Sequence, residues 1–181
     1  MTPEPHARYH RQTLLPDIGE AGQSRLGSSH AVVIGCGALG CTVADLLARA
    51  GVGSLTLIDR DLVEETNLQR QVLFDQRHAD ERTPKAAAAS ERITEINPSV
   101  RTRPVIADFS PINAETIAIG GDSVSPGVLI DGTDNYETRF LINDLAVKHG
   151  VPYVYAGAVS TRATTMTVVP GETPCLRCLF G

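Results

Sequence analysis

The stretch Ala31–Asp59, AVVIGCGALGCTVADLLARAGVGSLTLID, decides the fold of this chain. An apolar run, a glycine turn, a helical pattern and a second apolar run ending on Asp59 follow one another, as in nucleotide-binding βαβ units. Gly35, Gly37 and Gly40 have the G-x-G-x-x-G spacing. In such units the glycines allow a tight turn, approach of backbone to a phosphate and close helix packing, and the acid binds ribose hydroxyls. The pattern predicts nucleotide binding without naming the nucleotide; another doubly wound fold with a tight turn is the alternative.

Composition narrows the class of protein. With 181 residues, 42% of them apolar, the chain is long enough for one domain with a sizeable core. A net charge of −5 and the absence of Trp disfavour a nucleic-acid partner. The start of the chain lacks the apolar core of a secretory signal, and Asp45 and Arg49 interrupt the most apolar stretch, which argues against a membrane span. Four cysteines without a signal indicate the cytoplasm.

Alternating strand and helix patterns follow the first unit. Residues 6–28 look helical, and a polar connection from 60 to about 82 is long enough to be functional or disordered. A helix is expected from Thr83 as cap and Pro84 as first helical residue to Asn97, and another from 136 to Gly150. The last two strands, within 151–160 and 162–170, have no helix between them. We therefore predict an α/β, Rossmann-like, doubly wound sheet that is mostly parallel with a mixed edge.

Two basic side chains are placed to meet phosphates. Ligands in such sheets bind beyond the carboxyl ends of the strands, where the segment Asn67–Gln71, NLQRQ, follows Asp59. The guanidinium of Arg70 suits polyphosphate, although a solvated loop is equally consistent. Lys85 is at the expected second helical position, where its positive charge is next to the positive end of the helix dipole. This is unfavourable unless an anion lies nearby.

Two carboxylates follow the apolar run VLI in the segment DGTDN. Asp134 could coordinate Mg²⁺ that bridges phosphates, or it could cap the next helix with Glu137 three residues on. Asp131, at the end of the strand, could serve either purpose. The residues alone leave both alternatives open.

Cys175 and Cys178 form a C-x-x-C pair, which can supply half of a tetrahedral zinc site. Cys36 and Cys41 lie in and beside the glycine turn, and we expect them to be small buried hydrophobes. No second C-x-x-C follows, so another chain completes such a site or the C-terminus is missing. A redox pair is the other interpretation.

The motifs together resemble the ThiF/MoeB/HesA family, relatives of the ubiquitin-activating enzymes. In family order, the chain contains RYHRQ (Arg8–Gln12), VIGCGALG, LIDRDLVEETNLQRQ, the helix start TPK, DGTDN and PCLRC. This resemblance covers nearly the whole chain. It implies ATP rather than NAD, and acyl adenylation of the C-terminal carboxylate of a ubiquitin-like sulfur-carrier protein ending in Gly-Gly.

The resemblance also implies roles for single residues. Arg11 would act as an arginine finger, reaching the ATP of the partner subunit across a two-fold homodimer. Cys175 and Cys178 would supply half of a structural zinc site, and Asp134 would bind Mg²⁺. The nucleotide would lie against the following residues: Gly35, Gly37, Ala38, Gly40, Asp59, Asn67, Arg70, Lys85, Asp134 and Asn135. Arg11, Arg70, Lys85 and Asp134 would act in catalysis.

On this basis the chain is divided into an N-terminal helical segment with the arginine finger (1–28), an ATP-binding adenylation domain (29–171) and an incomplete C-x-x-C segment (172–181). Ala38 stands where many members have a third glycine within the turn, and the chain stops at Gly181, before the second cysteine pair expected of the family. We therefore expect a truncated member. Other interpretations remain: adenylation of a small-molecule or tRNA-base carboxylate, an NAD-binding oxidoreductase, or an adapter that binds a carrier without catalysis.

Overall fold

The computed structural model describes residues 7–121 and 125–180. The first six residues of the expected N-terminal segment, and Gly181 of the C-x-x-C segment, lie outside this range. None of the helices in the described part of the chain is long and apolar enough to cross a membrane.

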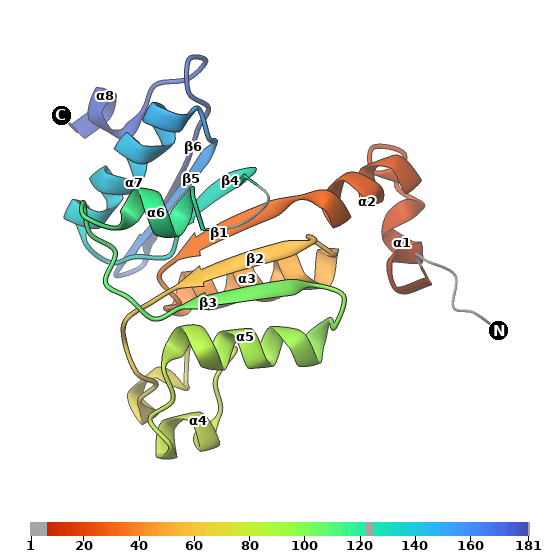
Figure 1. The fold of residues 1–181 in the computed structure, drawn as a ribbon, viewed down its shortest axis with the longest axis horizontal. Helices are drawn as coiled ribbons and strands as arrows, with labels where there is room; N and C mark the ends of the chain where they lie inside the picture. The colour runs from red at the N-terminus through yellow and green to blue at the C-terminus, as the bar shows by residue number, and fades with distance from the viewer. Residues whose placement is uncertain (1–6, 122–124, 181) are drawn as a thin grey trace.

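A six-stranded sheet runs through the molecule in the order β3-β2-β1-β4-β5-β6 (Figure 1). Its strands are β1 (His30–Ile34), β2 (Ser54–Ile58), β3 (Arg101–Val105), β4 (Val128–Asp131), β5 (Tyr153–Val159) and β6 (Arg162–Val168). Only β6 is antiparallel to its neighbour. The predicted doubly wound sheet with a mixed edge is confirmed.

Helices cover both faces of this sheet. The α-helices of the described residues are α1 (His10–Thr13), α2 (Gly19–Ser28), α3 (Ala38–Ala50), α4 (Gln76–Asp80), α5 (Lys85–Ile96), α6 (Ala114–Ala118), α7 (Tyr136–His149) and α8 (Leu176–Phe180). Successive side chains of β1 point to opposite faces, as the period of a strand requires. Ala31 and Val33 join the core beneath α3 and α5, and Val32 and Ile34 join the core beneath α6 and α7.

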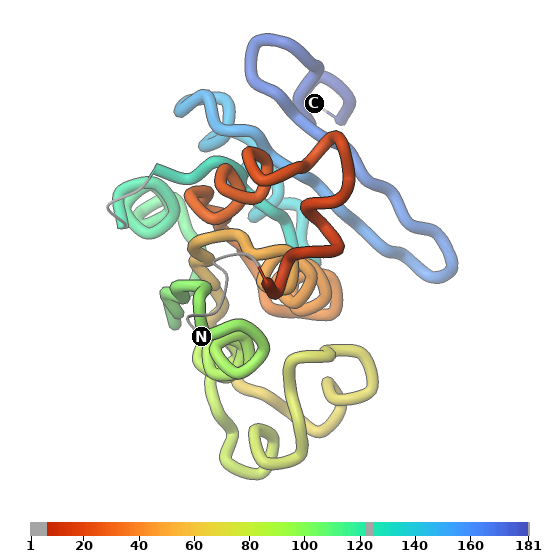
Figure 2. Tube along the Cα trace, turned by 90° about the vertical axis from the view of Figure 1, so that its right-hand side faces the viewer, coloured from red at the N-terminus to blue at the C-terminus, as the bar shows by residue number. Residues whose placement is uncertain are grey.

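The two edges of the sheet differ. Strand β5 pairs with β4 at two positions only, Tyr153 and Val154, but with β6 along its whole length. In Figure 2 the blue β5–β6 hairpin accordingly extends beyond the other strands. Its outer residues, Ala158–Thr165, are exposed.

One helix start differs from the prediction. Thr83 does not cap α5, because its backbone pairs with other segments: its N–H donates to the His78 carbonyl, and its carbonyl accepts from the Val63 N–H, both at 2.9 Å. Pro84 is extended (φ −57°, ψ 132°) and is the residue before the helix, so Lys85 is the first helical residue rather than the second. The expected helix ends are confirmed at Asn97 and at Gly150, which has φ 66°.

Candidate functional site

A cavity of about 600 Å³ opens where the parallel strands end, at the loops that follow β1, β2 and β4. Nine of the residues expected at the nucleotide line it: Gly35, Gly37, Ala38, Asp59, Asn67, Arg70, Lys85, Asp134 and Asn135. Four segments far apart in the sequence therefore meet at one place, as expected for a doubly wound sheet.

Two glycines of the turn, Gly35 and Gly40, have no room for a side chain. Gly35 has φ 90°, and a Cβ there would lie 2.7 Å from the Gly132 carbonyl. A Cβ on Gly40 would overlap the Gly35 carbonyl oxygen, so Gly40 serves helix packing and does not line the cavity. Gly37 directly precedes α3, and no described side chain caps this helix. The first N–H groups of α3 therefore lie at the cavity, as they do in helices that bind anions.

Asp59 is held by the glycine turn. Its Oδ2 accepts a hydrogen bond from the Cys36 N–H at 2.7 Å, and its Oδ1 accepts one from the Asp61 N–H at 2.8 Å. Burial raises the pKa of the Asp59 carboxyl, and these two hydrogen bonds oppose the rise. The carboxylate is thus fixed at the cavity with both oxygens oriented by backbone.

Basic groups occupy one wall. Lys85 is only 8% exposed, and its Nζ donates to Asp61 Oδ2 at 3.1 Å. Arg70 is exposed, with Nη1 donating to the Thr66 carbonyl at 2.7 Å. The side-chain oxygen of Asn67 accepts from the Glu64 N–H at 3.1 Å, which orients the Asn67 amide at the cavity.

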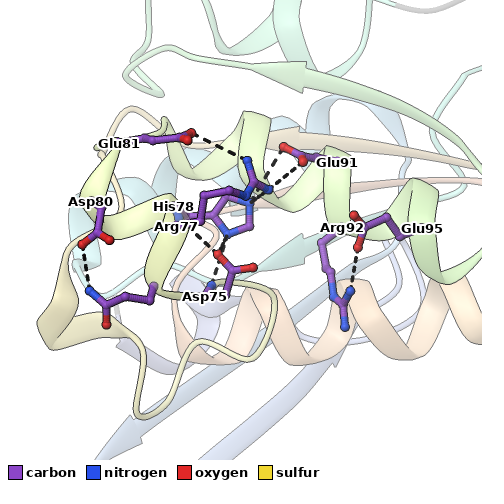
Figure 3. Close-up of polar contacts among 9 residues, drawn as sticks. Asp75, Arg77, His78, Asp80, Glu81, Glu91, Arg92 and Glu95 are labelled. Carbon is purple, nitrogen blue, oxygen red and sulfur yellow. Dashed lines mark hydrogen bonds and ion pairs between the residues drawn. The ribbon is translucent and has the colours of Figure 1, made fainter.

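The connection that carries Asn67 and Arg70 is fastened to α5 rather than disordered. Asp75 caps α4 by accepting from the His78 N–H at 3.1 Å, and His78 Nδ1 in turn accepts from the Asp75 N–H. Arg77 reaches from α4 to Glu91 of α5 at 2.7 Å (Figure 3). These contacts keep one wall of the cavity in place.

The loop after β4 excludes helix capping as the role of either of its carboxylates. Asn135, not Asp134, caps α7, because its side-chain oxygen accepts from the Thr138 N–H at 2.8 Å. Asp131 is buried and accepts from the Thr133 N–H and hydroxyl and from the Tyr153 hydroxyl, so it serves neither as cap nor as an open metal ligand. Asp134 is exposed, and within the described residues no hydrogen bond or ion pair engages its carboxylate.

Sequence reasoning missed several residues that line the cavity, among them Arg60, Asp61, Asp108 and Arg139. Arg139 is only 7% exposed, which is unusual for a residue that carries a guanidinium group. The signal lay in the helical spacing, because Arg139 shares a face of α7 with Ile142, Asn143 and Ala146, all buried.

The other expected residues lie elsewhere. Arg11 is exposed on α1, which packs against α2 (Figure 1), and it does not line the cavity of its own chain. Cys36 and Cys41 are buried as expected. The Sγ atoms of Cys175 and Cys178 are 3.7 Å apart. Burial raises the pKa of the Cys175 thiol, but hydrogen bonds from Cys178, Arg177 and Asn143 outweigh this, and the net shift is downward.

In the part of the chain that the structure describes, these two thiols have no third His, Cys, Asp or Glu ligand beside them. Among residues 7–121 and 125–180, no group of three or more His, Cys, Asp or Glu side chains is placed to hold a metal ion. The C-x-x-C pair therefore fits half of a tetrahedral zinc site and not a complete one.

The chain is similar to known proteins over nearly its whole length. The family model described as ThiF family matches residues 9–181. The sulfur carrier protein ThiS adenylyltransferase of Bacillus subtilis is 46% identical over 173 residues, which cover 96% of this chain and 50% of that protein. The sulfur carrier protein adenylyltransferase of Thermus thermophilus is 40% identical over 185 residues, covering 99% of this chain and 65% of that protein.

A crystal structure of E. coli MccB with ATP has a similar fold. The TM-score is 0.81 at 25% identity, with 96% of this chain and 52% of that one covered. The chain thus spans about half the length of several of the proteins it matches.

Proposed function

Because this chain belongs to the ThiF family, whose model matches residues 9–181, we propose that it is an ATP-dependent adenylyltransferase. Its substrate would be the C-terminal Gly-Gly carboxylate of a ubiquitin-like sulfur-carrier protein. The single observation that carries this proposal is the cavity in which the glycine turn, Asp59, Arg70, Lys85 and the unengaged Asp134 converge. The names of the relatives from B. subtilis and T. thermophilus support the same activity.

The cavity fits ATP by chemistry. The start of α3 offers backbone N–H groups to phosphate, and Asp59 offers oriented carboxylate oxygens to ribose hydroxyls. Lys85 and Arg70 supply positive charge on one wall. An NAD oxidoreductase would leave these two cations without a role, so we favour ATP.

Mg²⁺ fits at Asp134. The ion is typically held by one or two carboxylates together with substrate phosphates and water, rather than by an all-protein cage. Asp134 is the carboxylate in the cavity that no described residue engages, whereas Asp131 is fully used by Thr133 and Tyr153. When bound, Mg²⁺ would neutralise charge on the phosphates.

The chain's contribution to the reaction is positioning and charge neutralisation. The carrier's carboxylate is itself the nucleophile, so no general base is required. It attacks the α-phosphorus of ATP, the bond to the bridging oxygen breaks, and pyrophosphate leaves with the electron pair. Arg70 and Lys85 would stabilise the charge that builds up on the phosphate oxygens. The product is a carrier acyl-adenylate.

Three further parts of the proposal concern the assembly. Arg11 lies far from its own cavity, which supports a homodimer in which it reaches the partner subunit's ATP. Cys175 and Cys178 would supply two thiolates to a structural zinc site, with the remaining ligands from outside the described residues. The divisions 1–28, 29–171 and 172–181 would correspond to finger, adenylation and zinc-binding segments.

ATP–pyrophosphate exchange tests the proposed function. We expect exchange that requires Mg²⁺ and a carrier ending in Gly-Gly, and that falls in Arg70→Ala and Asp134→Ala. Both side chains are exposed, so neither substitution should change stability by more than about 0.5 kcal/mol. Full activity in either variant would contradict the assignment of that residue. If small carboxylates support ATP–pyrophosphate exchange as well as the carrier does, the carrier is not the specific substrate.

A further inference from the structure

The loop between β4 and α7, residues 132–135, is pressed against the glycine turn on one side. The Gly132 N–H donates to the Ile34 carbonyl at 2.7 Å. A Cβ on Gly132 would overlap the Gly35 carbonyl oxygen and lie 2.9 Å from the Cα of Gly40. The first residue of the loop is therefore fixed by backbone contacts alone.

The next residue, Thr133, is fixed by side chains from both directions. Its N–H and hydroxyl donate to Asp131 Oδ1 at 2.8 and 2.7 Å, and its carbonyl accepts from Arg139 Nη2 at 2.8 Å. Arg139 is the only described side chain that bonds to this carbonyl. Asp134 follows directly, and no described residue engages its carboxylate at the cavity.

The guanidinium of Arg139 is itself immobilised. Its centre lies 5.2 Å from the ring of Tyr136 and 5.2 Å from the ring of Tyr155. Its Nε is buried, has no hydrogen bond to a described residue and lies 3.6 Å from Asp131 Oδ2. The guanidinium therefore faces the buried Asp131 carboxylate on one side, while its Nη2 donates to the Thr133 carbonyl. The planar guanidinium holds both contacts in one fixed geometry, whereas a Lys ammonium is a compact charge on a flexible stem.

We propose that Arg139 is a positioning residue, which holds the Thr133 carbonyl so that the loop presents Asp134 to Mg²⁺. The inference rests on the proposed function, because it takes Asp134 as the carboxylate for that ion. Arg139 acts through the backbone of its own loop and makes no contact with the metal. Outer partners that orient a metal ligand commonly affect metal affinity by about 10- to 100-fold.

The test compares Arg139→Lys with the wild-type chain in two measurements. First, the Mg²⁺ concentration that half-saturates ATP–pyrophosphate exchange should rise about tenfold or more, and excess Mg²⁺ should restore most of the rate. The half-saturating carrier concentration should stay unchanged. Second, hydrogen exchange of the Thr133 amide should become faster, because its acceptor Asp131 faces the Arg139 guanidinium and the Thr133 carbonyl is bonded to it. The Gly132 amide, bonded to Ile34, should keep its rate.

Arg177→Lys is the matched control. Arg177 also lies over an aromatic ring, Phe140 at 5.1 Å, and pairs with a carboxylate, Asp144 at 2.6 Å, but it lies outside the cavity. It should alter neither measurement. A merely structural role for Arg139 would lower the melting temperature and the amount of active protein without moving the Mg²⁺ requirement, and that result would overturn the proposal.

A second variant covers the case in which Arg139→Lys does not fold. Tyr155→Leu removes one ring beside the guanidinium and keeps its hydrogen bond, so we expect a smaller shift of the Mg²⁺ requirement in the same direction. An unchanged requirement in this variant would then overturn the proposal. If the wild-type chain shows no ATP–pyrophosphate exchange at all, the proposed function fails. Hydrogen exchange of the Thr133 amide then still shows whether Arg139 holds the loop.

Discussion

Replacing Gly40 by Ala tests the packing of the nucleotide turn most severely. The new Cβ would overlap the Gly35 carbonyl oxygen and lie 3.0 Å from the Gly35 carbonyl carbon and 3.4 Å from Val33 Cγ1. Both backbone partners belong to the turn, so relief requires α3 to move away from β1. Overpacking of this kind costs about 1–3 kcal/mol and occasionally more, while the better helix propensity of Ala returns about 0.5–1 kcal/mol.

We take the upper part of that range for Gly40→Ala, because backbone cannot rotate aside as a side chain can. A net loss of about 2–3 kcal/mol corresponds to a fall in melting temperature of roughly 4–12 °C for a chain of this size. Urea unfolding followed by circular dichroism measures the loss. Gly27→Ala is the control, because a Cβ there meets nothing within 4 Å, and it should be neutral or slightly stabilising.

Gly37→Ala separates folding from binding in the same turn. A Cβ on Gly37 would lie 3.5 Å from the Gly132 carbonyl oxygen, an ordinary contact, so stability should be retained. Because Gly37 lines the cavity, we expect weaker ATP binding by calorimetry. A free energy of unfolding for Gly40→Ala within about 0.5 kcal/mol of the wild-type value would refute this packing of the turn.

Two further predictions concern Asn135 and Asp59. Asn135→Ala removes the acceptor of the Thr138 N–H and should cost about 1 kcal/mol in urea unfolding, whereas Asn135→Ser should recover most of it; equal losses would argue against capping. Burial raises the pKa of Asp59, so the folded state keeps this proton to higher pH than the unfolded chain. The protonated Asp59 carboxyl therefore contributes its whole stabilisation below the unfolded-state pKa of about 3.9, and this stabilisation disappears as the pH rises through the folded-state pKa. The difference between wild type and Asp59→Asn in unfolding free energy should follow that curve, and a difference of opposite sign would contradict the burial argument.

Much of the fold was predictable from local pattern. The glycine spacing and the carboxylate at the end of the second apolar run identify the first βαβ unit, because each residue there has a steric or bonding role that few others could fill. The antiparallel edge was predictable because no helix separates the last two strands. Gly150 ended its helix as expected, since a left-handed φ of 66° suits glycine.

The errors arose where tertiary contacts outweigh local preference. Thr83 has the right chemistry for a helix cap, but its backbone is drawn into hydrogen bonds with Val63 and His78. Asp134 and Asn135 are adjacent and both can cap, so the choice depended on where α7 begins. Arg139 was missed because the helical spacing marks its face of α7 as buried but does not show which groups surround the cation.

The most direct test of the central claim is the intact mass of a carrier protein ending in Gly-Gly after incubation with this chain, ATP and Mg²⁺. The account predicts that the carrier gains one AMP group, that pyrophosphate is released in equal amount, and that Asp134→Ala abolishes both. A carrier that stays unmodified while the wild-type chain binds ATP would contradict adenylation of that carboxylate at this cavity.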